Sequence, residues 1–181
     1  MNTPSRIEQD IALLHDFVTG FVVDEFDTYG RENGQPVGCS TLPSSLLPLY
    51  AVLPGSFPPL YEQLVLSYRW TQAELPWYTL LANPAGADLD GLFKQIQADP
   101  GLSDVLIPSG YIQFGRGSGG SYDPVCFDTR HRHKDGDCRV VQIDHEQILC
   151  NGRIIEVSEV ARSFREIVEK SLRHNLSKRA T

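Results

Sequence analysis

Three short segments decide the fold class: Tyr111-Ile112-Gln113-Phe114, Tyr122-Asp123-Pro124-Val125-Cys126-Phe127-Asp128 and Arg139-Val140-Val141-Gln142-Ile143-Asp144. Each is rich in β-forming residues and is bounded by turn formers, so we expect three successive strands, with Val140 to Ile143 inside the sheet. Downstream, Asn151-Gly152 separates two apolar triplets and predicts a two-residue hairpin, because both residues accept positive φ. The C-terminal half therefore reads as an antiparallel, meandering sheet.

Helical patterns lie on both sides of this sheet. Thr3-Pro4 predicts the start of a helix whose apolar residues recur at helical spacing up to Phe21. Residues 24–41 contain several turn formers and predict a loop, either without regular structure or holding one short strand. A last helix is expected from Ser158, with an apolar face that includes Phe164. The predicted class is α+β, with N-terminal helices and a closing C-terminal helix.

Between these regions the chain is rich in proline, and two shorter helices are expected. One runs from Leu60 to Tyr68 behind Pro58-Pro59. The other is capped by Asp88 and ended by Asp99-Pro100-Gly101. Five aromatic residues between positions 61 and 78 are interpreted as core, with a groove or an interface as the alternative.

Length and composition bound the protein class. The chain has 181 residues, of which 41% are apolar and 22% charged, as in one globular domain spanning 1–181. No apolar stretch approaches the roughly 20 residues that cross a bilayer, and the polar N-terminus does not resemble a secretory signal. We expect a cytoplasmic protein that does not bind a membrane.

The cysteines predict neither disulfides nor a zinc site. The four cysteines are widely spaced, and no C-x-x-C pair is present. We therefore expect reduced, buried thiols and no cofactor. They are Cys39, Cys126, Cys138 and Cys150.

Acidic residues are concentrated in the first half of the chain. Residues 1–100 hold four basic and twelve acidic side chains, whereas the remainder is nearly neutral. This balance disfavours nucleic acid as a direct ligand. It suits a basic protein partner, with Asp24, Glu25 and Asp27 as candidate contacts, or else it only keeps the surface solvated.

A glycine-rich segment, Gly115-Arg116-Gly117-Ser118-Gly119-Gly120, formally contains the G-x-G-x-x-G pattern. A dinucleotide site requires a helix to begin there, but Tyr122-Asp123-Pro124 leads into another strand. We expect a flexible loop between antiparallel strands. Arg116 and Tyr122 are the residues through which this loop would touch a partner.

Metal-ligating side chains crowd into ten residues: Asp128, His131, His133, Asp135 and Asp137. Three basic residues lie among them and a fourth, Arg139, follows closely; these charges would repel a cation, and Asp135-Gly136-Asp137 is ordinary turn sequence. The favoured interpretation is a solvated hairpin tip in which Asp128, His131, His133 and Asp137 do not converge. A metal-dependent hydrolase using these four residues is the alternative.

A base and an acid stand side by side in Asp144-His145-Glu146. Neighbouring strand residues point to opposite faces, and no nucleophile accompanies them in sequence. We therefore assign no catalytic residue and expect contacts at the end of a strand.

The C-terminal segments together resemble the SUKH superfamily, the Smi/Knr-like proteins. The resemblance rests on Gly110 to Gly115, Tyr122 to Asp128, Val140 to Glu146 and Ser163-Phe164. Members similarly show an early Leu-Pro, a strand ending in Phe-Gly, a glycine-rich turn, a strand ending in Asp and a terminal helix announced by Ser-Phe. Leu42-Pro43 matches the first of these features. The match covers roughly 42–172 and is clearest over 110–172.

One segment departs from the family pattern. Members often carry an aromatic segment with Asn-Gly after Leu-Pro, whereas this chain has proline-rich sequence and Tyr68-Arg69-Trp70. The chain resembles a divergent bacterial-type member.

The resemblance implies a non-catalytic, protein-binding module. Many bacterial members of the superfamily are thought to be immunity proteins that neutralise polymorphic toxins, and fungal relatives act as regulatory scaffolds. Expected functions are therefore immunity against a basic toxin domain or, alternatively, regulation through a cellular partner.

Overall fold

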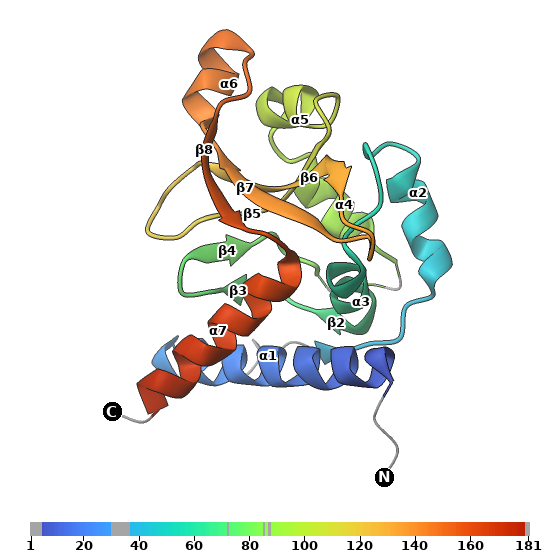
Figure 1. The fold of residues 1–181 in the computed structure, drawn as a ribbon, viewed down its shortest axis with the longest axis vertical. Coiled ribbons are helices and arrows are strands. Elements are labelled where there is room, and N and C mark those ends of the chain that lie inside the picture. Colours follow the sequence, from blue (N-terminus) through green and yellow to red (C-terminus); the bar gives the residue numbers. More distant parts are fainter. Residues whose placement is uncertain (1–4, 30–36, 72, 85, 87, 180–181) are drawn as a thin grey trace.

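An antiparallel sheet runs through the centre of the computed structural model, which describes residues 5–29, 37–71, 73–84, 86 and 88–179 (Figure 1). The side chains of residues 20–29, 37 and 179 lie outside this description. Within the described residues the sheet has six strands in sequence order, which confirms the predicted meander. They are β3 (Ala73–Glu74), β4 (Tyr78–Leu80), β5 (Tyr111–Gly117), β6 (Pro124–Arg132), β7 (Cys138–Ile143) and β8 (Glu156–Ala161).

The three strands expected from the sequence correspond to β5, β6 and β7. β7 pairs with β6 on one side and β8 on the other, so Val140 to Ile143 lie inside the sheet as expected. Among the described residues a second sheet consists of β1 (Val37–Gly38) and β2 (Tyr68–Arg69).

The helices confirm the α+β class. The N-terminal helices precede most of the sheet, and α7 closes the chain. The described helices are α1 (Arg6–Tyr29), the 3-10 helix η1 (Pro43–Leu46), α2 (Leu47–Tyr50), α3 (Pro59–Ser67), α4 (Asp90–Ile96), α5 (Pro100–Leu106), α6 (His145–Asn151) and α7 (Phe164–Arg179). None of these helices has the length and apolarity needed to cross a membrane.

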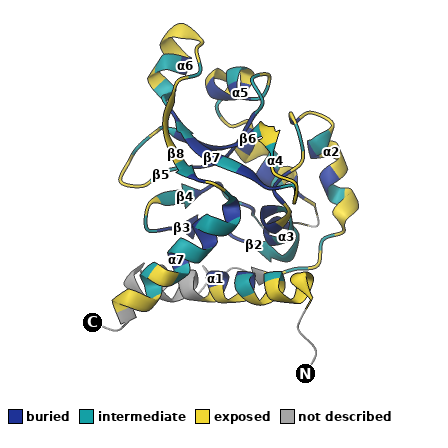
Figure 2. Ribbon diagram, in the orientation of Figure 1, coloured by how far each residue is buried: buried dark blue, intermediate teal, exposed yellow. Residues whose placement is uncertain are grey.

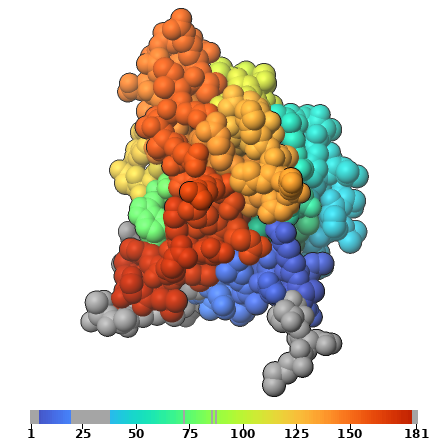
Figure 3. Space-filling model, in the orientation of Figure 1, coloured from blue at the N-terminus to red at the C-terminus, as the bar shows by residue number. Residues whose placement is uncertain are grey.

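Both faces of the sheet are buried, because alternate residues of the central strands enter two separate cores. Ile112 and Phe127 join the larger core, whereas Tyr111 and Cys126 join the smaller one. The helices α1, α3, α4 and α7 contribute to the larger core, and α5 and α6 contribute to the smaller one. Figure 2 shows the central strands largely buried, and Figure 3 shows α7 lying against α1 at one end of the molecule.

Tyr61 of α3 is the centre of the larger core. Its ring makes edge contacts with Phe57, Phe114, Phe127 and Phe164 at centroid distances of 5.0–5.6 Å. Edge-to-face packing of this kind adds to the burial of apolar area. Trp70 is buried too, so the core interpretation holds for these two aromatics, but Trp77 is 42% exposed.

The predicted hairpin at Asn151-Gly152 is wrong. The triplet before it belongs to α6, and Gly152 ends this helix with φ 59° and ψ 29°. Its amide donates a hydrogen bond to the carbonyl of Ile148 at 2.9 Å. The positive φ that glycine permits is therefore used for a left-handed helix cap and not for a hairpin turn.

Three helix boundaries also differ from expectation. Residues 24–29, predicted as loop, continue α1. Pro100 begins α5 in addition to ending the region of α4, because proline suits a first helical turn. Ser158 lies in β8, and α7 begins at Phe164, at the Ser-Phe pair on which the family resemblance rests.

A capping box explains the start of α7. The amide of Glu166 donates to Ser163 Oγ at 3.1 Å, and the amide of Arg162 donates to Glu166 Oε2 at 2.8 Å. The first bond satisfies an amide that the first helical turn leaves without a partner, and the second ties the glutamate to the residue before the cap, one position earlier than in the usual capping box.

Candidate functional site

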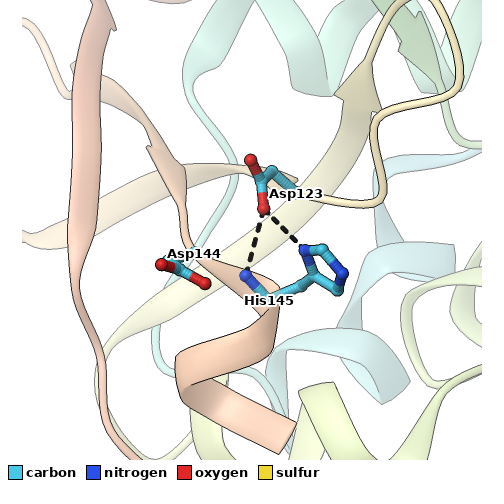
Figure 4. A group of neighbouring side chains, drawn as sticks. All are labelled: Asp123, Asp144 and His145. Atoms are coloured by element: carbon cyan, nitrogen blue, oxygen red, sulfur yellow. Dashed lines mark hydrogen bonds and ion pairs between the residues drawn. The ribbon is translucent and has the colours of Figure 1, made fainter.

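Tyr122, Asp123, Asp144 and His145 form a polar site at the end of the β6–β7 pair; Figure 4 shows the last three of them. Tyr122 and Asp123 end the glycine-rich loop that follows β5. Asp144 and His145 follow β7, where α6 begins. Because Val125 of β6 pairs with Gln142 of β7, antiparallel register brings the two segments together.

The Asp123 carboxylate connects the loop to α6. Its Oδ1 atom accepts hydrogen bonds from the His145 amide at 3.1 Å and lies 2.7 Å from His145 Nδ1. Its Oδ2 atom accepts a bond from Gln142 Nε2 at 3.2 Å. Burial alone would raise the pKa of Asp123, but the bonds from His145 and Gln142 outweigh it and hold the pKa below its usual value.

This contact fixes the orientation of the imidazole. An ionised carboxylate only accepts hydrogen bonds, so the ring nitrogen facing Asp123 must carry a proton. In the neutral ring, Nε2 is then the acceptor. His145 keeps 26% of its side chain exposed, so the site presents an oriented imidazole that can accept a hydrogen bond or a proton.

Asp144 has a structural role in the same site. Its Oδ1 atom accepts the Gln147 amide at 3.0 Å, and this bond caps α6. β7 ends at Ile143 and α6 begins at His145, so these residues make contacts at the end of a strand, as expected.

Asp123, Asp144 and His145 are also the described residues whose geometry comes closest to a metal site, with ligand atoms within 4.8 Å of one another. The separation of 2.7 Å between Asp123 and His145 is that of a hydrogen bond. Two ligands at about 2.0–2.2 Å from one tetrahedral ion would lie farther apart. A cation would have to break this bond.

Tyr122 is the exposed part of the site. Its side chain is 67% exposed, and its ring centroid lies 5.9 Å from that of His145. The turn before it uses Gly119 and Gly120, both with positive φ and open space around them. The expected loop between antiparallel strands is confirmed, because β5 pairs with β6 and no helix begins there.

The other predicted contact residues are Arg116, which lies beside this site in β5, and three residues of α1 whose side chains lie outside the described part of the chain. Arg116 lies in β5 opposite Pro124 of β6, and its Nε atom is buried without a hydrogen-bond partner in the described structure. Asp24, Glu25 and Asp27 belong to α1, but their side chains lie outside the described residues.

The crowded segment from Asp128 to Asp137 forms a hairpin, and its two buried carboxylates are engaged in structural bonds. Asp128 is fully buried and accepts hydrogen bonds from Arg130 at 2.8 Å and Arg139 at 2.9 Å. Asp137 accepts the amide of Cys138 at 2.8 Å. The expectation of a solvated tip is thus wrong for Asp128 and Asp137, whereas His131 and His133 are exposed.

The contact between Asp123 and His145 was not predicted. Its signal was present, since the strands starting near Val125 and ending near Ile143 were both identified. The sequence does not specify the geometry of the hairpin tip between these strands, and this geometry sets their register. A register shifted by one residue would place different side chains opposite each other.

Comparison with models of known protein families and with curated proteins found no match for this chain.

Proposed function

We propose that this chain is a non-catalytic protein-binding module of the SUKH type, which binds its partner through the loop that carries Tyr122. The observation that carries the proposal is the exposure of this tyrosine on an anchored loop. Its neighbour Asp123 forms hydrogen bonds with His145 and Gln142, and these bonds hold the backbone next to Tyr122 in place. Aromatic residues that lose little conformational freedom are typical anchors of protein interfaces.

The proposed role is immunity, in which the chain binds and blocks a basic toxin domain. The acidic first half of the sequence supports a basic partner, because opposite charge speeds encounter. A regulatory scaffold would use the same type of surface with a cellular partner. The resemblance to the superfamily supports both roles.

Photo-crosslinking tests the binding surface directly. A photoreactive phenylalanine analogue replaces Tyr122 in one variant and Leu176 in a control, because these residues are 67% and 66% exposed on different elements. We expect one protein to be crosslinked from position 122 and not from position 176. Equal yields from both positions would contradict the assignment of the surface.

The recovered protein then serves in a binding assay with purified components. Tyr122→Ala is expected to weaken binding by at least tenfold, while Leu176→Ala leaves the dissociation constant unchanged, because an anchor residue typically contributes about 2 kcal/mol or more. Co-expression separates the two roles. Rescue of cells from the recovered protein's toxicity supports immunity, and a non-toxic partner supports the scaffold role.

A further inference from the structure

A groove of about 490 Å³ lies between α3 and the tip of the β6–β7 hairpin, away from the Tyr122 site. Its volume falls within the range of small-ligand sites, about 300–1,000 Å³. Consecutive turns of α3 form one wall, and the segment before α3 and the hairpin form the other. The lining residues are Ser56, Phe57, Pro59, Glu62, Gln63, Leu66, Ser67, Arg132 and Gly136.

Arg132 brings a positive charge to the hairpin wall. Its guanidinium donates to the carbonyl of Gly136 at 2.6 Å and to that of Ser56. In the described part of the chain, no ion pair includes Arg132. Carbonyl oxygens orient the guanidinium but leave its charge without a counter-ion.

Glu62 brings a negative charge to the α3 wall. Its Oε2 atom accepts a hydrogen bond from the Tyr50 hydroxyl at 2.6 Å. Among the described residues, Glu62 likewise forms no ion pair. The groove therefore holds one positive and one negative group, and in the described part of the chain neither forms an ion pair.

We propose that this groove binds a short peptide with free termini, with its carboxylate at Arg132 and its ammonium group at Glu62. The apolar body of the peptide would lie against Phe57, Pro59 and Leu66, which also line the groove. A ligand that carries both charges can pair with Arg132 and with Glu62, whereas a simple anion or cation can pair with only one of them. Partly buried charges are the ones that gain most from a matched counter-charge. The site uses no residue of the Tyr122 surface and does not depend on the proposed function.

Peptides with blocked ends test the two charges separately. The probes are the tripeptide Ala-Leu-Ala, its N-acetylated form, its C-terminal amide and free leucine, each titrated into the full chain by calorimetry and by amide NMR shifts. We expect the free tripeptide to bind most tightly, and each blocked end to weaken binding by tenfold or more. The shifts should centre on α3 and on residues 132–136.

Side-chain variants test the groove itself. In Glu62→Gln the charge is lost but an oxygen remains to accept the Tyr50 hydroxyl bond, so the fold should be retained. This variant should bind the free tripeptide at least tenfold more weakly and should no longer distinguish it from the acetylated form. The matched control is Glu159→Gln on β8, an exposed residue outside the groove, which should bind as the wild type does.

Gln63→Trp provides a second, steric test, because a bulky ring on α3 fills the groove from one wall. Its melting temperature verifies that it is folded, and its binding should be lost. The proposal is overturned if the wild type does not bind the free tripeptide at millimolar concentration, if Glu62→Gln binds it normally, or if the shifts lie elsewhere.

Discussion

Asp128 of β6 is fully buried, and Arg139 of the neighbouring strand β7 donates a hydrogen bond to its Oδ2 atom at 2.9 Å. Arg130 bonds the other oxygen, and Glu156 of β8 lies 2.7 Å from Arg139 Nη2 and bonds Tyr111 of β5. This ionic cluster therefore links four strands of the sheet. Two positive and two negative groups in contact neutralise one another, which makes the burial of the Asp128 carboxylate tolerable.

The first prediction is that acid weakens the fold through Asp128. Burial alone would raise its pKa, but the bonds from Arg130 and Arg139 outweigh this effect and lower the pKa to about 2, against a usual 3.8. A lowered carboxyl pKa contributes stability that is present above about pH 4 and is lost as the pH falls toward 2. The free energy of unfolding should therefore drop by about 2 kcal/mol over this window.

Asp128→Asn tests the cluster, since the amide leaves the two guanidinium groups without their buried partner. We expect a loss of about 3 kcal/mol at pH 7 and a flatter acid limb in denaturant titrations. Asp104→Asn, on an exposed position of α5, is the control and should leave both quantities unchanged. An equal acid limb in wild type and Asp128→Asn would show that another carboxylate causes the acid sensitivity.

A second prediction concerns the helix cap at Gly152. Its φ of 59° is unfavourable for a residue with a side chain, although an added Cβ would meet open space. Gly152→Ala should therefore cost about 1 kcal/mol of stability, and Gly152→Asn less, because asparagine tolerates this conformation better. Thermal unfolding measures both. If alanine were as stable as glycine, the left-handed cap would be wrong.

The same residue explains one limit of the sequence-based prediction. Asn-Gly indicates positive φ equally well for a hairpin turn and for a helix end. Here the side chain of Asp144 accepts the Gln147 amide and caps a helix, so the helix forms. The strands around Phe114, Phe127 and Val140 were predictable because their apolar residues alternate between two cores. The groove at Glu62 and Arg132 was not predictable, since 70 residues of chain separate its two charges.

Thiol reactivity provides a third prediction. The expectation of buried thiols is wrong for Cys150, which is exposed on α6, while Cys39 is partly buried and the remaining two are buried. Burial raises the pKa of the Cys126 thiol well above its usual value and raises that of Cys138 to about 12. Because the thiolate is the reactive form, an aromatic disulfide reagent at pH 8 should modify Cys150 first and Cys39 more slowly.

Cys126 and Cys138 should react only when the protein unfolds. Mass spectrometry of peptides from a time course identifies each modified residue, and Cys150→Ser should remove the fast phase alone. Rapid labelling of Cys126 in the folded protein would contradict the burial of this residue in β6.

The last prediction is that His145 is neutral in the Nδ1–H form when it is unprotonated. Oδ1 of Asp123 lies 2.7 Å from Nδ1, and the pKa of Asp123, which His145 and Gln142 hold below its usual value, keeps this carboxylate ionised at neutral pH and above. An ionised carboxylate can only accept a hydrogen bond, so Nδ1 must carry the proton. The preference of an isolated imidazole for the Nε2–H form is therefore reversed at this position. Nitrogen NMR shifts of the two ring atoms at pH 8 measure this directly.

Asp123→Asn replaces the anionic acceptor by a neutral amide and should reduce the Nδ1–H population, whereas the exposed His133 should show the same shifts in both proteins. A dominant Nε2–H form in the wild type would mean that Asp123 does not orient the ring. The proposal that Asp123 anchors the loop that carries Tyr122 would then lose its main support.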